Sequence, residues 1–161
     1  MRALILCLVL MVSACSLRAQ ARSSCVVSRI VDGDTFYCED GTKVRPIGFD
    51  APERAQGDAA DSATATLRRW VAPGDTVALE RDVSLTDRYG RRLAWVWRGD
   101  TLVNERMVAS GWALLYTVPP DVRHVEALRA AERAARAQRA GLWGMEGFDC
   151  PPSDYRRHRC R

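Results

Sequence analysis

The sequence predicts an α+β fold, a small five-stranded β-barrel of the OB type with about three helices. Three observations carry this prediction: several short β-rich segments, two closely spaced Asp-Gly turn signals, and helix-favouring segments between and after the strands. Five short strands in this order fit a small closed antiparallel barrel decorated by helices. A chain of 161 residues, 47% hydrophobic and 27% charged, favours one soluble globular domain with a real core.

The first half of the predicted barrel is a three-stranded meander. Its strands are expected at residues 26–31, 35–38 and 43–49. Asp32-Gly33 and Asp40-Gly41 separate them, and Asp-Gly dipeptides are typical of hairpin turns. Two such turns so close together predict three consecutive antiparallel strands.

A helix is predicted directly after the meander, at residues 58–71. Ala63, Leu67 and Trp70 recur there at helical spacing, and Pro73-Gly74 ends the helix. The two remaining strands are expected on either side of a polar turn, at residues 76–80 and 93–97.

Two helices complete the predicted fold. Residues 102–110 are expected to form a short helix that Gly111 ends. Asp121 follows Pro119-Pro120 and is expected to cap a long helix that runs to Ala140. The apolar residues that recur along its inner face are Val125, Leu128, Ala131 and Ala135.

The first 21 residues are expected to be a signal peptide. Arg2 precedes an apolar run at residues 3–12, which is too short to span a membrane and right for a signal sequence. Ala19-Gln20-Ala21 is a cleavage site that would leave residues 22–149 as the domain. The mature protein would then be secreted or periplasmic.

Residues 12–15 allow a second route of export. They resemble a lipobox, so cleavage before Cys15 would leave a membrane-anchored lipoprotein. We favour simple export because the Ala-x-Ala site is clean.

Four cysteines remain after either cleavage: Cys25, Cys38, Cys150 and Cys160. An even number in an exported domain indicates two disulfides. Three pairings are possible, and the sequence-local one needs the least folding. A zinc site is the alternative, although the spacings are long and no Cys-x-x-Cys pair exists. Residues 150–161 are expected to be a polar tail held by its disulfide.

Net charge says little about partners. The whole chain carries +4, and removal of Arg2 and Arg18 with residues 1–21 leaves +2. Because this excess is small, any argument for nucleic-acid binding must rest on local placement.

Acidic residues near predicted strand ends suit a hard metal ion. Asp34 follows a tight turn, Asp50 ends a strand, and Ala51 offers a backbone carbonyl beside Pro52. Calcium takes oxygen ligands of this kind and completes its shell with water and substrate oxygens. The sequence therefore predicts a site for a hard divalent cation at Asp34, Asp50 and Ala51, with a ligand set that Ca²⁺ tolerates.

A third acid and two arginines suit hydrolysis of a phosphate ester. Glu53 lies three residues beyond Asp50 and is expected beside the ion, where it could act as a general base on water. Arg45 and Arg91 can bind a phosphate and neutralise charge that grows as water attacks phosphorus. Each cluster alone could be a turn, a helix cap or a solvated pair. Their joint order and spacing favour a site.

The combined motifs resemble those of the thermonuclease (staphylococcal-nuclease-like) family. The matching segments run in order within residues 25–143, at residues 31–35, 44–53, 86–92 and 103–105. The resemblance implies an OB-type barrel with three helices. It also implies a calcium-dependent nuclease that hydrolyses DNA and RNA by metal-assisted in-line attack of water and leaves 3′-phosphate ends.

The resemblance also assigns roles to individual residues. It implies Asp34, Asp50 and the Ala51 carbonyl as metal ligands, and Arg45, Glu53 and Arg91 as catalytic residues. It implies Arg88, Tyr89 and Tyr116 as substrate-binding residues.

Pro46 directly follows Arg45 and removes one donor from the strand ladder, so the direction of the Arg45 side chain is uncertain. A non-catalytic OB-type module that binds single-stranded nucleic acid is the alternative function. No protein partner is implied, and the chain is expected to be a monomer.

Overall fold

The computed structural model describes residues 22–160. The predicted signal peptide and the candidate lipid anchor at Cys15 therefore lie outside the described residues. The strands are β1 (Ser23–Asp32), β2 (Thr35–Cys38), β3 (Lys43–Pro46), β4 (Phe49–Asp50), β5 (Thr76–Glu80), β6 (Arg92–Arg98), β7 (Thr101–Leu102) and β8 (Leu114–Leu115). The α-helices are α1 (Asp58–Trp70), α2 (Val103–Ala109), α3 (Val125–Ala137) and α4 (Pro152–Tyr155), with short 3₁₀ turns η1 (Arg54–Gln56) and η2 (Gly141–Trp143).

Five of these strands close into a barrel, as predicted. The sheet runs in the order β3-β2-β1-β5-β6-β7, and β3 also pairs with β6. The predicted all-antiparallel closure is wrong, because the β3–β6 pairing is parallel. An odd number of strands cannot close with every neighbour antiparallel, so one pairing in a five-stranded ring must be parallel. The fold is nevertheless the predicted α+β, OB-type architecture with three substantial helices.

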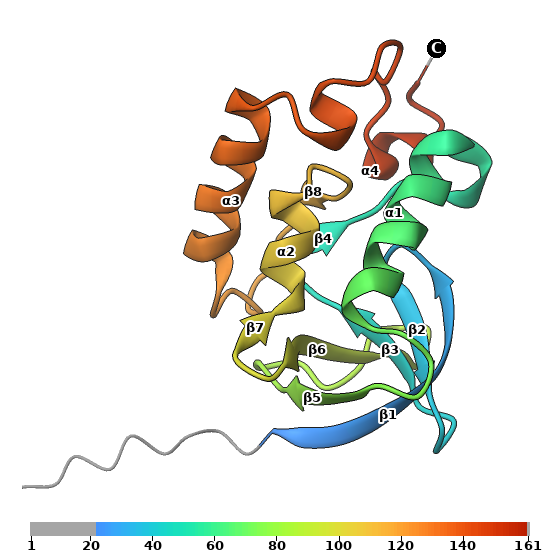
Figure 1. The fold of residues 1–161 in the computed structure, drawn as a ribbon, viewed down its shortest axis with the longest axis vertical. Coiled ribbons are helices and arrows are strands. Elements are labelled where there is room, and N and C mark those ends of the chain that lie inside the picture. Colours follow the sequence, from blue (N-terminus) through green and yellow to red (C-terminus); the bar gives the residue numbers. More distant parts are fainter. Residues whose placement is uncertain (1–21, 161) are drawn as a thin grey trace, which may run out of the picture.

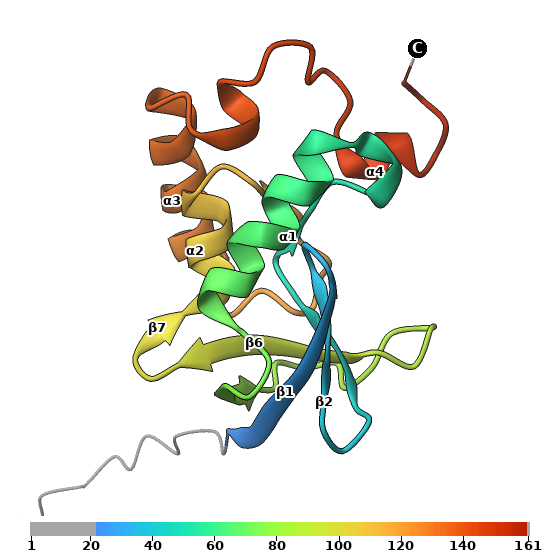
Figure 2. The same ribbon diagram turned by 45° about the vertical axis from the view of Figure 1, so that its right-hand side comes forward.

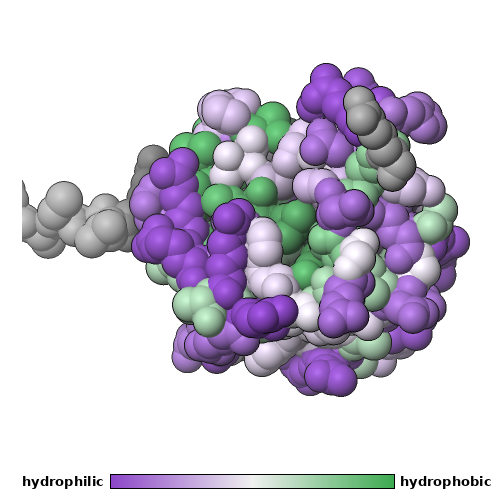
Figure 3. Space-filling model, turned by 90° about the horizontal axis from the view of Figure 1, so that it is seen from above, coloured by the Kyte–Doolittle hydropathy of each residue, from purple (hydrophilic) through white to green (hydrophobic). Residues whose placement is uncertain are grey.

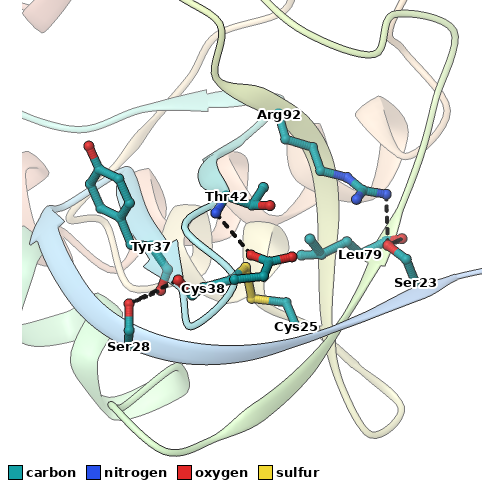
Figure 4. Close-up of a disulfide and its surroundings, with 9 residues drawn as sticks. Ser23, Cys25, Ser28, Tyr37, Cys38, Thr42, Leu79 and Arg92 are labelled. Atoms are coloured by element: carbon teal, nitrogen blue, oxygen red, sulfur yellow. Dashed lines mark hydrogen bonds between the residues drawn. A yellow bond between two sulfur atoms is a disulfide. The ribbon is translucent and has the colours of Figure 1, made fainter.

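The predicted meander of β1, β2 and β3 is confirmed. β1 pairs antiparallel with β2, and β2 with β3. A disulfide joins Cys25 on β1 to Cys38 on β2 at the far end of this hairpin, and both side chains lie in the core (Figure 4). Nearby, the Ser28 hydroxyl donates to the Tyr37 carbonyl. The sequence-local pairing is therefore present here.

The second disulfide is also sequence-local and joins Cys150 to Cys160. Two disulfides in one small domain are typical of proteins that fold outside the reducing cytoplasm. No helix within the described part of the chain is long and apolar enough to cross a membrane.

The predicted third strand at 43–49 is in fact two short strands. β3 ends at Pro46, and β4 begins at Phe49 and pairs with β8. Gly48 separates them with φ of +85°, and a Cβ atom there would lie 2.7 Å from both Leu128 and Trp95. The chain turns where only glycine fits, and this turn directs β4 away from the barrel wall.

The three main helices lie together over one side of the barrel (Figures 1 and 2). The buried core includes Trp95, Phe36, Leu67 and Met107. Asn104 of α2 is fully buried: its Nδ2 donates to the Ile47 carbonyl at 2.7 Å, and its Oδ1 accepts from the Val96 N–H at 2.8 Å. This side chain attaches α2 to the barrel because it satisfies backbone groups that would otherwise be buried without partners.

The last long helix differs from its prediction at both ends. The inner-face residues are buried as predicted, but α3 begins only at Val125 and ends at Ala137. Asp121 does not cap it. The Asp121 carboxylate instead accepts the backbone N–H groups of Val83 and Ser84 at 2.9 and 2.8 Å. Asp121 therefore binds a loop distant in sequence instead of capping the helix.

Candidate functional site

A cleft of about 900 Å³ collects side chains from segments far apart in the sequence. Its wall includes the turn after β1, the β3–β4 corner, residues 84–91, residues 116–121 and residues 153–157. The predicted site residues that line it are Asp34, Arg45, Asp50, Glu53, Arg88, Tyr89, Arg91 and Tyr116. Ala51 is not part of this lining, and it is buried at 2% exposure.

The turn that carries Asp34 packs tightly against the segment that follows β4. A Cβ atom on Gly33 would lie 2.7 Å from the Ala51 Cβ and 2.8 Å from the Ala63 Cβ of α1. Because Gly33 has no side chain, the turn can approach Ala51. The Asp34 carboxylate then accepts the Ala51 backbone N–H at 3.2 Å.

Arg45 bridges the two predicted acidic ligands. Its Nη1 lies 3.1 Å from Asp34 Oδ2, and its Nη2 lies 3.1 Å from Asp50 Oδ1. The same guanidinium donates to the backbone carbonyls of Pro46 and Phe49 at 3.2 and 3.0 Å. Pro46 is the last residue of β3, and the Arg45 side chain points into the cleft. The two carboxylates therefore lie on either side of one planar cation.

Burial raises the pKa values of two acids in this cluster. Asp50 is 2% exposed, and this burial raises its pKa above the ordinary value, although Arg156 and Arg45 pull the pKa in the other direction. Burial, and then the neighbouring charge of Asp34, raises the pKa of Asp32 to about 6. Burial thus disfavours the ionised forms of Asp32 and Asp50, and neighbouring cations offset this for Asp50.

Glu53 occupies the corner between β4 and α1. Its backbone N–H donates to the Gln56 Oε1 at 2.9 Å, which closes a capping box around η1. The Glu53 side chain faces the cleft and remains 38% exposed. This carboxylate is thus held beside Asp50 on a fixed turn, with access to water.

Arg91 enters the cleft from the loop before β6. Its Nε donates to Asp87 Oδ2 at 2.7 Å, and its backbone N–H donates to Asp87 Oδ1 at 3.0 Å. Partial burial alone would raise the pKa of Asp87, but these bonds from Arg91 outweigh it and lower the pKa below its ordinary value. Arg91 Nη1 also lies 3.4 Å from Thr35 Oγ1, beside Asp34. The Asp87 carboxylate therefore directs the guanidinium toward the acidic cluster.

The predicted substrate-binding residues lie at the rim of the cleft. Tyr89 is 68% exposed, and its hydroxyl accepts from Arg88 Nη2 at 2.7 Å. The Tyr116 backbone N–H donates to the Gly48 carbonyl at 3.0 Å, which places this residue beside the β3–β4 corner. An exposed aromatic ring such as that of Tyr89 can stack on a planar base.

One residue of the site was not predicted from the sequence. Arg156 follows α4 in the segment expected to be only a polar tail, and its guanidinium contacts both Asp50 and Glu53. Hydrogen bonds to Asp50, and then to Glu53, raise the pKa of Arg156 above its ordinary value. The sequence does show an arginine-rich segment between two cysteines. It does not show against which part of the domain this segment packs.

Charge in the cleft is balanced only because of the C-terminal segment. The cationic lining residues are Lys43, Arg45, Arg88, Arg91, Arg156 and Arg157, and the anionic ones are Asp32, Asp34, Asp50, Glu53, Asp87 and Asp121. Two of the six cations therefore come from the C-terminal segment. Without them, four cations would face six carboxylates and the cleft would repel a polyanion.

The donor set fits a hard cation such as Ca²⁺. Asp34 and Asp50 both contact the Arg45 guanidinium, so their oxygens lie close together. Within residues 22–160, no group of three or more His, Cys, Asp or Glu side chains is arranged to hold a metal. The structure thus brings two of the predicted ligands, Asp34 and Asp50, together, and water or substrate oxygens would complete the shell of an ion held there.

Comparison with known proteins identifies similar chains. The sequence profile described as "Staphylococcal nuclease homologue" matches residues 43–145. The thermonuclease of Staphylococcus intermedius is 31% identical over 127 residues, which cover 74% of this chain and 76% of that protein. An uncharacterized endonuclease of Haemophilus influenzae is 34% identical over 149 residues, which cover 90% of this chain and 78% of that protein.

Proposed function

The chain belongs to the staphylococcal nuclease family, and from this premise we propose that it is an exported, calcium-dependent nuclease. The proposed reaction is hydrolysis of phosphodiester bonds in DNA and RNA, which leaves 3′-phosphate ends. The observation that carries the proposal is the convergence of Asp34, Arg45 and Asp50 in one cleft that Glu53 and Arg91 also line. The names thermonuclease and endonuclease of the similar proteins agree with it.

The acids of the cleft divide into two roles in this proposal. Asp34, Asp50 and the Ala51 carbonyl would hold Ca²⁺, which when bound screens the charge of the substrate phosphate. Glu53 accepts a proton from the water that attacks phosphorus. The Glu53 side chain is 38% exposed, so water can reach this carboxylate.

The arginines bind and stabilise the phosphate. Arg45 and Arg91 approach the acidic cluster from different sides, from β3 and from the loop before β6. A guanidinium keeps its charge and offers paired donors to phosphate oxygens. Both side chains can therefore neutralise the charge that develops as water attacks in line with the leaving 5′ oxygen.

Export is proposed from two observations. Residues 1–21 have the composition of a signal peptide, and both disulfides suit an oxidising compartment. The proposed location is secreted or periplasmic, with a lipoprotein anchored at Cys15 as the alternative.

A cleavage assay tests the proposal directly. Plasmid DNA and a single-stranded RNA are incubated with the mature protein in excess calcium and, in parallel, in excess chelator. Cleavage of both substrates in calcium only is the expected result, with products that carry 3′-phosphates. Binding of either nucleic acid without any cleavage in calcium would favour the non-catalytic module instead.

A further inference from the structure

The C-terminal segment places the guanidinium of Arg156 against the acids of the proposed active site. Arg156 Nη1 donates to Glu53 Oε1 at 2.6 Å and to Asp50 Oδ1 at 3.0 Å, and its Nη2 donates to Asp50 Oδ2 at 2.6 Å. One planar group therefore spans the carboxylate proposed to hold the ion and the carboxylate proposed to activate water. Charge-assisted bonds this short fix both partners.

Several contacts hold this segment against the Glu53 corner. The disulfide between Cys150 and Cys160 closes the loop around α4, and Pro152 is buried. Gln56 Nε2 donates to the Cys150 carbonyl at 2.8 Å, while its Oε1 accepts the Glu53 N–H. α4 lies beside the start of α1 in both ribbon views (Figures 1 and 2).

The end of the molecule where α4 lies has a largely hydrophilic surface, as expected where a polar segment docks. Seen from the end of the molecule where α4 lies, hydrophilic side chains gather around a less polar centre (Figure 3). The Arg156 side chain itself is 39% exposed, so its position depends on its carboxylate partners more than on burial.

Arg156 does not occupy every acceptor site on the carboxylates of Asp50 and Glu53. A carboxylate offers about four lone-pair sites. Asp50 accepts one bond from Arg45 and two from Arg156, so it retains capacity for a cation. Arg156 bonds only Oε1 of Glu53, and the side chain remains 38% exposed, so the carboxylate can still accept a proton from water.

We propose that Arg156 is a positioning residue of this nuclease, which holds the Glu53 carboxylate at a fixed distance from that of Asp50. The inference rests on the proposed function. Within the described residues, Glu53 has no other side-chain ion pair. Loss of the guanidinium would leave only the capping box to restrain the Glu53 side chain, so the carboxylate could sample further rotamers. A small misplacement of a general base is costly.

Kinetics of variants at this position test the proposal. Arg156→Ala is expected to lower kcat by about 10- to 100-fold, the scale for loss of a group that orients an active-site residue, with little change in KM. Arg156→Lys should recover part of the loss because it keeps the charge but not the paired donors. Arg159→Ala is the matched control, since Arg159 lies in the same loop and its ion pair is with Asp154, at 3.9 Å.

Two further readouts separate positioning from a structural role. In a double-mutant cycle, Arg156→Ala should cost little once Glu53→Gln is present, because Arg156 acts through Glu53. Guanidinium ion added at millimolar concentration should restore part of the activity of Arg156→Ala but not that of Glu53→Gln. Thermal unfolding confirms that each variant is folded.

The outcomes are distinguishable. Suppose that the wild type cleaves, but that Arg156→Ala leaves kcat unchanged or that its effect simply adds to that of Glu53→Gln. Either result would overturn this inference and leave the proposed function standing. Faster cleavage by Arg156→Ala, with tighter calcium binding in titration calorimetry, would overturn it in favour of an arginine that competes with the ion. Absence of cleavage by the wild type in calcium would overturn the proposed function, and this inference with it.

Discussion

Glu53 and Arg91 reach the cleft from separate segments, and neighbouring side chains direct both. Arg156 holds the carboxylate of Glu53, and Asp87 holds the guanidinium of Arg91. The sequence motifs identified Glu53 and Arg91 because each lies in a short local pattern. Arg156 could not be predicted in the same way, because its partners are more than a hundred residues away.

Asp87 offers a residue-scale test with a defined pH dependence. Its pKa is lowered in the folded state, so its pairing with Arg91 stabilises the protein above the ordinary aspartate pKa and is lost as pH falls through the lowered one. Asp87→Asn should therefore reduce the free energy of unfolding by about 0.5–1 kcal/mol near neutral pH and by much less near pH 2, well below the ordinary aspartate pKa. Urea unfolding at both pH values measures this.

The same substitution should affect activity through Arg91. Asp87→Asn is expected to lower turnover less than Arg91→Ala does, because the guanidinium remains but is less well directed. Equal stability of Asp87→Asn and wild type at both pH values would show that the ion pair contributes nothing.

At the scale of elements, local patterns predicted the strands and helices but not the contacts that redirect them. The Asp-Gly turns specified the meander, and apolar spacing specified α1 and the inner face of α3. The break at Gly48 and the use of Asp121 both depend on residues distant in sequence, Leu128 and Val83 among them. A pattern along the chain carries no information about such neighbours.

Gly48 provides a matched pair of substitutions. Gly48→Ala should destabilise the fold by about 2–4 kcal/mol, because φ is +85° and the new Cβ would meet Leu128 and Trp95. Gly41→Ala is the control: φ is +83°, and nothing lies within 4 Å of its Cβ position. Its expected cost is only about 1 kcal/mol. Similar costs for both variants in chemical denaturation would mean that packing at the β3–β4 corner is unimportant.

At the scale of the whole molecule, the barrel brings five separate segments to one cleft. Closure through the parallel β3–β6 pairing places Arg45 directly opposite Leu93, two residues beyond Arg91. The C-terminal disulfide loop then supplies two cations to a wall that would otherwise be acidic. The barrel and the acid and arginine positions followed from the sequence, while this last contribution required the structure.

The most direct test of the account is the turnover of Glu53→Gln in saturating calcium. The single-turnover rate for one phosphodiester bond in a defined oligonucleotide is measured beside that of the wild type, with calcium binding and thermal unfolding as checks. The account predicts a rate lower by roughly two to three orders of magnitude with the fold and calcium affinity retained. A rate close to that of the wild type would contradict the role of Glu53 and the division of labour built around it.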